Sequence, residues 1–189
     1  MEIQINKIIK YPNPTLKLKS EDILEINSET LNLYARLIKN MQFYQAAGIS
    51  AIQIGTPLKM FAIANENQVF INPEILETSG EAIHREGCLS FPEVYVVVKR
   101  PERVKLKYTN LAGKELVEDF TGFDARVILH EEAHLRGKTF LDEVTRFKFQ
   151  IAKDKINKLI KSGRWKEYDA IVDSMQGIEW PITGTGTAQ

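Results

Sequence analysis

The chain has 189 residues, of which 43% are hydrophobic and 26% are charged, so it is long and apolar enough for one folded domain and is not a disordered chain. The 25 basic residues balance 25 acidic ones, which argues against direct sequence-specific nucleic-acid binding as the main function. No apolar run approaches the roughly 20 residues of a membrane helix, and the N-terminus lacks the apolar block of a signal peptide. We therefore expect a cytoplasmic protein that does not enter membranes, or an organellar one if a transit peptide has been removed.

The first 20 residues contain Pro12 and Pro14, which favour an extended, turning segment over a helix. A helix is predicted to follow from about Ser28, with Asn27 or Ser28 as its N-cap, and to end at Gly48. Its apolar residues at near-helical spacing are Leu31, Tyr34, Ile38, Met41 and Phe43.

Between Ala51 and Thr121 the pattern changes to short runs rich in Val, Ile and Phe. The runs are AIQI, MFAIA, VFI, YVVV and VKLKY, and residues that favour turns separate them. These runs predict strands of mostly antiparallel sheet. The run AIQI is expected to be the first of them.

Two more helices are predicted after these strands. Asp124 is expected to cap the segment ARVILHEEAHLR, which ends at Gly137, and the last helix spans about Thr145 to Lys161. The last helix has an apolar side with Phe149, Ile156 and Ile160, and it carries the lysines Lys148, Lys153, Lys155, Lys158 and Lys161. Those lysines indicate either a solvated surface or a basic face that binds a partner. The final TGTGTAQ is expected to be disordered.

The second of these helices contains the pattern HExxH at His130, Glu131 and His134. Residues four apart lie on one face of a helix, so the two imidazoles can converge on a single metal ion. Glu131, one step round the helix, can then reach a water bound to that ion. The alternative is that both histidines are ordinary surface or core residues.

A catalytic metal site needs three protein ligands and one position open for water. Cys88 is the candidate third ligand, because a thiolate binds Zn²⁺ and Fe²⁺ strongly. As the only cysteine, it cannot form an intrachain disulfide, and its alternative role is that of an inert buried thiol. His84, the remaining histidine, is expected to border the site or lie on the surface.

These residues resemble the peptide deformylase family in three motifs that occur in the family's order. They are AGISAIQIG with Gly48, Gln53 and Gly55, then EGCLS from Glu86 to Ser90, then HEEAHLRG from His130 to Gly137. The resemblance covers roughly residues 5 to 145. It implies an α+β fold in which mostly antiparallel sheets pack around the central HExxH helix, with an N-terminal helix and a C-terminal helical extension.

The resemblance further implies an enzyme that removes the N-formyl group from N-formylmethionine at the start of newly made polypeptides, releasing formate. Residues 1–145 would form its catalytic domain, and residues 146–189 a helical extension and tail of the same domain. The implied cofactor is one divalent ion, Fe²⁺ first and Zn²⁺, Ni²⁺ or Co²⁺ as alternatives. Formylated nascent chains, and the ribosome through the basic helix, are the implied partners.

By the same resemblance, each motif residue receives a role. Cys88, His130 and His134 bind the metal ion, and Glu131 acts as general acid and base. Gln53 and the Leu89 N–H hold the formyl oxygen, and the backbone near Gly48 aligns the peptide. His84 stands where the family tends to place an apolar residue of the methionine pocket, so it is included as a substrate-binding residue that could alter side-chain preference.

The sequence also departs from the family. Ala46 replaces a usual glycine, Ser50 a usual alanine, and Ala133 a usual aspartate beside the second histidine. The last change leaves the strength of metal binding open, since carboxylates near metal ligands orient them and tune metal affinity. Glu132 is expected to point elsewhere.

Two other functions remain open at this point. A zincin-type protease also uses HExxH, although Cys88 as third ligand favours a deformylase. A deformylase-like fold kept only for binding a peptide or the ribosome is the other, although the intact ligand set with Glu131 argues against it.

Overall fold

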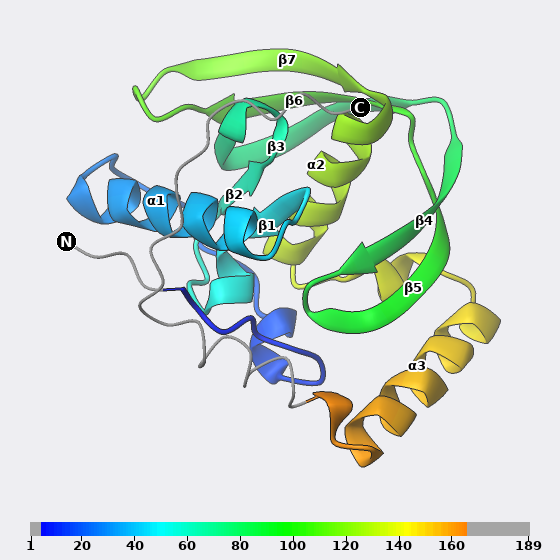
Figure 1. Cartoon of the computed structure of the whole chain (residues 1–189). Coiled ribbons are helices and arrows are strands. Elements are labelled where there is room, and N and C mark those ends of the chain that lie inside the picture. Colours follow the sequence, from blue (N-terminus) through cyan, green and yellow to red (C-terminus); the bar gives the residue numbers. More distant parts are fainter. Residues whose placement is uncertain (1–4, 166–189) are drawn as a thin grey trace.

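The computed structural model describes residues 5–165 and confirms the α+β class (Figure 1). Its α-helices are α1 (Ser28–Phe43), α2 (Gly122–Leu135) and α3 (Arg146–Lys161). Its strands are β1 (Gly48–Ser50), β2 (Met60–Ile63), β3 (Val69–Ser79), β4 (Ala82–Cys88), β5 (Phe91–Arg100), β6 (Arg103–Thr109) and β7 (Glu115–Thr121). Short 3-10 helices are η1 (Pro14–Lys17), η2 (Ala51–Ile54), η3 (Asn65–Asn67) and η4 (Phe140–Glu143). No helix in residues 5–165 has the length and apolarity needed to cross a membrane.

A five-stranded antiparallel sheet, in the order β1-β2-β3-β6-β7, has a helix on each face at its β1–β2 end. In β2, Met60 and Ala62 pack into the cluster that contains α1 residues, whereas Phe61 and Ile63 pack into the cluster that contains α2 residues. Successive strand residues point to opposite faces, so a strand covered on both faces is apolar throughout. The run MFAIA owes its composition to this position.

Helix α2 lies between the five-stranded sheet and the two-stranded β4–β5 sheet (Figure 1). Every residue from Ala125 to Leu135 is buried, because neighbouring elements surround most of the helix. Strands β4 and β5 pair antiparallel with a register shift between Glu86 and Cys88. This arrangement agrees with the predicted mostly antiparallel sheets around a central helix.

Helix α3 packs against β5. The side chains in their shared cluster include Val94, Val96, Val98, Ala152, Ile156, Leu159 and Trp165. The Trp165 indole N–H donates to the Tyr11 carbonyl at 2.9 Å, and Lys10 Nζ donates to the Trp165 carbonyl at 2.6 Å. The C-terminal extension is thereby joined to the N-terminal segment.

The run AIQI, predicted as a strand, forms η2 instead. The Gln53 side chain accepts a hydrogen bond from the Ser50 N–H, and Gly55 ends the turn with a left-handed φ of 82°. A four-residue apolar run does not distinguish a strand from a buried helical turn by periodicity. The strand prediction was therefore wrong at this point.

Two predicted helix ends also differ. Helix α1 ends at Phe43 and the chain turns through Gln45, whose φ is 50°, so Gly48 belongs to β1 and not to the helix exit. Helix α2 begins after Thr121, and Asp124 lies in its first turn, where it accepts a hydrogen bond from Asn65 instead of capping the helix.

Three more predictions can be compared with the structure. The N-terminal segment has no α-helix within the described residues, and its one short 3-10 turn, η1, forms because Asn13 caps it and Pro14 suits a first helical position. Ile160 is 41% exposed, and Leu159 takes its place on the apolar side of α3. The Asn27 cap is confirmed by its hydrogen bonds from the second and third helical N–H groups. The TGTGTAQ tail lies outside the described residues.

Asp142 links the segment after α2 to η1. Its carboxylate accepts from the Thr139 N–H and hydroxyl at 2.8 and 2.9 Å, and Lys17 Nζ lies 2.9 Å away. Partial burial raises the pKa of Asp142, but the bonds from Lys17 and Thr139 outweigh it and lower the pKa below 3.8. Such a carboxylate stabilises the fold above its unfolded pKa, and the contribution disappears as pH falls through the folded pKa.

We expect Asp142→Asn to reduce the free energy of unfolding at pH 7 by about 0.5–1 kcal/mol, a modest loss because solvent screens this half-exposed pair. The gap between variant and wild type should be smaller at pH 3, where the wild-type carboxyl begins to be protonated, and should shrink further as pH falls through its lowered pKa. Urea denaturation at the two pH values measures both quantities, and a gap that stays constant would contradict the ionic role.

Candidate metal centre and active site

Cys88, His130 and His134 meet where β4 contacts α2. Their ligand atoms all lie within 4.8 Å of one another, and Cys88 Sγ is 3.2 Å from His134 Nε2. The helix brings the two imidazoles together because they are four residues apart, and Cys88 follows the irregular register at the end of β4. A thiolate with two imidazoles fits a catalytic ion such as Zn²⁺ or Fe²⁺, with one position left for water.

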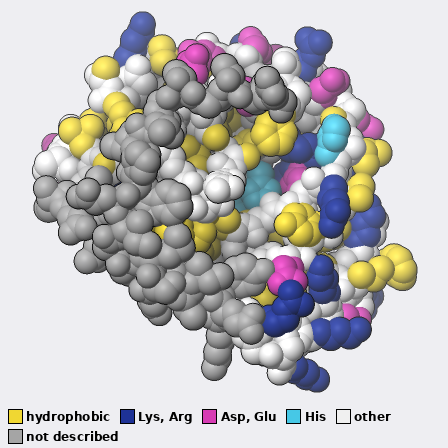
Figure 2. All heavy atoms as spheres, viewed as in Figure 1, with side chains coloured by type: hydrophobic (Ala, Val, Ile, Leu, Met, Phe, Trp, Pro, Cys, Tyr) yellow, Lys and Arg dark blue, Asp and Glu magenta, His cyan; other side chains and the backbone are white. Residues whose placement is uncertain are grey.

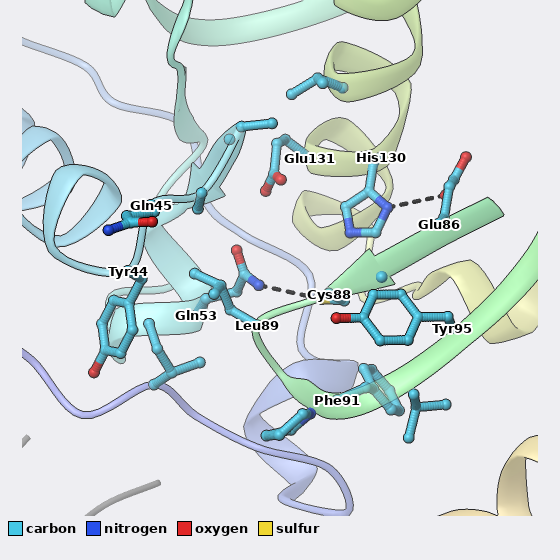
Figure 3. A pocket seen from close by; sticks show the side chains of 18 of the residues that line it. Tyr44, Gln45, Gln53, Glu86, Cys88, Leu89, Phe91, Tyr95, His130 and Glu131 are labelled. Carbon is cyan, nitrogen blue, oxygen red and sulfur yellow. Dashed lines mark hydrogen bonds and ion pairs between the residues drawn. The ribbon is translucent and has the colours of Figure 1, made fainter. Parts of the chain in front are cut away.

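The buried carboxylate of Glu86 forms a hydrogen bond with the Nδ1 side of the His130 ring (Figure 3). Glu86 Oε2 lies 3.1 Å from His130 Nδ1, which leaves His130 Nε2 for the ion. The same carboxylate accepts from Arg100 through Nε at 2.7 Å and through Nη2 at 3.0 Å, and it also accepts from Arg126 Nη1. Each carboxylate oxygen therefore has two donors, so this buried charge is fully paired.

At Glu86 and His130, burial and hydrogen bonding shift the pKa in opposite directions. Burial alone raises the pKa of Glu86, but the hydrogen bonds with His130 and Arg100 outweigh it and lower the pKa to about 2. Burial lowers the pKa of His130, but its bonds with Cys88 and Glu86 outweigh it and raise the pKa to about 10. Burial, followed by the charge of His130, lowers the pKa of His134.

His134 lacks the support that His130 has. Its Nδ1 is buried and has no hydrogen-bond partner in the described part of the chain. Glu132 does not supply one, because its carboxylate pairs with Arg136 at 2.7 Å. Ala133, fully buried, offers no polar group. The expectation that Glu132 points elsewhere agrees with this geometry.

Glu131 lies at the edge of the metal site, and Ser50 of β1 holds its carboxylate by a hydrogen bond. Ser50 Oγ donates to Glu131 Oε2 at 2.5 Å. A Cβ on Gly48 would lie 2.9 Å from Glu131 Cγ and 2.6 Å from Val127 Cγ1, so only glycine lets the strand approach α2 this closely. Burial raises the pKa of Glu131, while the charge of His130 and the Ser50 bond oppose that shift.

Gln53 presents its amide nitrogen to the same site. Its Oε1 accepts from the Ser50 N–H at 2.9 Å, so Nε2 must point the other way, toward Cys88 Sγ at 3.4 Å and Ser90 Oγ at 3.2 Å (Figure 3). This bond to the main chain settles which end of the amide is the donor. A donor beside the metal ligands suits an oxygen that gains negative charge.

These groups open into a cavity of about 540 Å³. Gly48, Gln53, Leu89, His130 and Glu131 are among its lining residues. Figure 2 shows a hollow on this face with hydrophobic side chains around it and a histidine side chain inside. The volume is within the range of small-molecule and peptide side-chain sites, so a short apolar side chain can enter beside the metal ligands.

His84 is exposed on β4 and is not among the residues that line this cavity, and it lies nearer the open end of the β4–β5 pair. The structure thus brings together every predicted site residue except this one. Sequence reasoning missed the roles of Ser50, Arg100 and Arg126. A charged residue inside an otherwise apolar helix such as ARVIL was the available indication for Arg126.

A Cys/His/His set with buried histidines and a partly buried cysteine, an adjacent carboxylate, an amide donor and an open cavity define a metal-dependent hydrolase. The polypeptide deformylase family model matches residues 5–150. A peptide deformylase of Phenylobacterium zucineum is 38% identical over 166 residues, with 84% of this chain and 98% of the relative covered. One from Dictyoglomus turgidum is 40% identical over 140 residues, with 73% and 92% covered.

Among solved structures, a peptide deformylase from Legionella pneumophila superposes with a TM-score of 0.79 at 29% identity, covering 85% of this chain and 98% of its own. The chain belongs to the peptide deformylase family. This is a family of metal-dependent hydrolases that remove the N-formyl group from the N-terminal formylmethionine of nascent polypeptides.

Proposed function

We propose that Cys88, His130 and His134 hold one divalent ion, Fe²⁺ first and Zn²⁺, Ni²⁺ or Co²⁺ as alternatives, and that the residues beside it remove formyl groups from N-formylmethionyl chains. The observation that carries this proposal is the convergence of the three ligand atoms within 4.8 Å beside the Glu131 carboxylate. When bound, the ion supplies a Lewis acid that polarises the formyl carbonyl and makes water acidic.

Glu131 is the proposed general acid and base. Its Oε2 is held by Ser50, so Oε1 is the oxygen available to take a proton from the attacking water. The same carboxyl then delivers a proton to the amine as the C–N bond breaks, which releases formate and a free N-terminus. Burial raises the pKa of this carboxyl, which favours the protonated form that delivers the proton to the amine.

Gln53 Nε2 and the Leu89 N–H are the proposed donors to the formyl oxygen as it gains charge. The backbone at Gly48 would align the peptide, since β1 borders the cavity and cannot carry a side chain at that position. The apolar part of the cavity would receive the methionine side chain. We do not retain His84 there, because its side chain is exposed outside the cavity.

We expect Gln53→Leu, which keeps the size of the side chain but removes the amide, to lower kcat by about 10²–10³, as the loss of one oxyanion donor does in other enzymes. The thermal midpoint should change little, and steady-state kinetics beside a thermal melt separate the two effects. A variant with wild-type kcat would remove Gln53 from this role.

The other proposals concern organisation and partners. Residues 1–145 would be the catalytic domain and residues 146–189 an extension of it, in a cytoplasmic enzyme. Ribosome binding through α3 is the partner proposal, supported by the exposed Lys153, Lys158 and Lys161. Lys148 and Lys155 contribute less, because their amines bond to carbonyls of Val97 and Glu93 in the same chain.

Deformylation of a formyl-Met peptide by protein purified anaerobically with Fe²⁺ tests the function directly. We expect formate release that is lost on chelation and restored by the metal, with a fixed ratio of one ion per chain. Casein serves as the control substrate and should not be cleaved. Absence of formate release by protein that holds its ion would overturn the proposal.

A further inference from the structure

Ser50 contacts two groups of the site that come from different elements, Glu131 of α2 and Gln53 of η2. It is the last residue of β1 and is fully buried. Its hydroxyl donates to Glu131 Oε2 at 2.5 Å and lies 3.2 Å from the Glu131 carbonyl, while its N–H donates to Gln53 Oε1 at 2.9 Å. One residue therefore contacts both the carboxylate and the amide that point into the cavity.

We propose that Ser50 is a positioning residue for deformylation, which acts through Glu131 and Gln53 and touches neither substrate nor metal. The proposal rests on the function proposed for those two residues.

The geometry explains why one hydroxyl can matter here. A glutamate side chain has three rotatable bonds, and a free carboxylate would sample several orientations. Here Oε2 is anchored by Ser50 and Oε1 lies close to Gly48, so two residues of β1, one at each end of the strand, restrict the orientation of the carboxylate. Holding a reacting group in place before the reaction removes an entropic cost from the barrier.

The main-chain N–H of Ser50 completes the arrangement. It holds Gln53 Oε1, which keeps Nε2 on the side of Cys88. Because the hydroxyl and the N–H belong to one residue at the end of a strand, the distance between the proton acceptor and the oxyanion donor is set by a short rigid segment. Removing the hydroxyl should release Glu131 and leave Gln53 in place.

The test compares Ser50→Ala with Ser20→Ala, using the metal-loaded enzyme and a formyl-Met peptide. Ser20 is the matched control, because it is also buried and its hydroxyl has no hydrogen-bond partner within residues 5–165. We expect Ser50→Ala to lower kcat by about 10- to 100-fold, the range for losing a hydrogen bond to a charged group. Its KM, metal content and thermal midpoint should stay near wild type. Ser20→Ala should change none of these.

A second measurement separates positioning from a general structural role. Glu131→Asp keeps the carboxyl group but withdraws it from Ser50, so Ser50→Ala should cost less than about twofold in that background. Ser50→Thr, which keeps the hydroxyl, should recover most of the activity.

Three results would overturn the proposal: a kcat for Ser50→Ala within twofold of wild type, a loss of activity that follows a loss of metal or of folded protein, or full additivity with Glu131→Asp. Inactivity of the wild-type enzyme itself would instead contradict the proposed function.

Discussion

Replacing Glu131 by glutamine is expected to lower kcat by about 10²–10⁴, the usual contribution of a general acid–base group, while the protein keeps its metal ion. Glutamine has the same size and can still accept from Ser50, but its amide cannot take a proton from water. The three ligand atoms lie on Cys88, His130 and His134, so metal content should stay at one ion per chain. Formate release and metal analysis on the same preparation measure both quantities.

Glu132→Gln is the matched control for this experiment. It is the same substitution one residue further along α2, where the carboxylate pairs with Arg136 and does not line the cavity. We expect its kcat to remain within about twofold of wild type. Near wild-type turnover by Glu131→Gln would remove Glu131 from the reaction, whichever way the control behaves.

Replacing Glu86 by glutamine should reduce the free energy of unfolding by about 3–5 kcal/mol, because it leaves two buried arginines without their carboxylate. Arg100 and Arg126 both donate to Glu86, and their side chains are almost entirely buried. A loss of this size is a large part of the 5–15 kcal/mol that usually stabilises a domain. Urea denaturation of the metal-loaded protein measures it.

The same substitution should weaken metal binding by about 10- to 100-fold, since His130 loses the carboxylate that orients its ring. Competition with a chelator of known affinity gives this second quantity. Glu77→Gln is a suitable control, because Glu77 forms a long surface pair with Lys105 and is largely exposed. Stability of the Glu86 variant equal to that of the control would show that the arginines find other partners.

The features that depend on short-range spacing or composition could be predicted from the sequence. The HExxH spacing determines which imidazoles share a helix face, and the structure confirms that Cys88 meets them. The apolar run of β2 and the cap at Asn27 also follow from short-range patterns.

The contacts that depend on long-range pairing could not be predicted. Ser50 reaches Glu131 only because β1 packs against α2, and 81 residues separate the two in sequence. Arg100 lies 14 residues from Glu86 and Arg126 lies 40 residues from it. The run AIQI was misassigned because a four-residue pattern holds no information on its tertiary surroundings. Exposure of His84 likewise depends on where β4 leaves the cavity.

His134, whose Nδ1 has no hydrogen-bond partner within residues 5–165, bears on metal binding but not on the surface of the cavity. Ala133 and His134 are fully buried and do not line the cavity, whereas His130 and Glu131 do. A substitution at position 133 can therefore alter how long an ion stays without altering the surface that the substrate meets. Metal retention and substrate selectivity would then depend on different residues of α2.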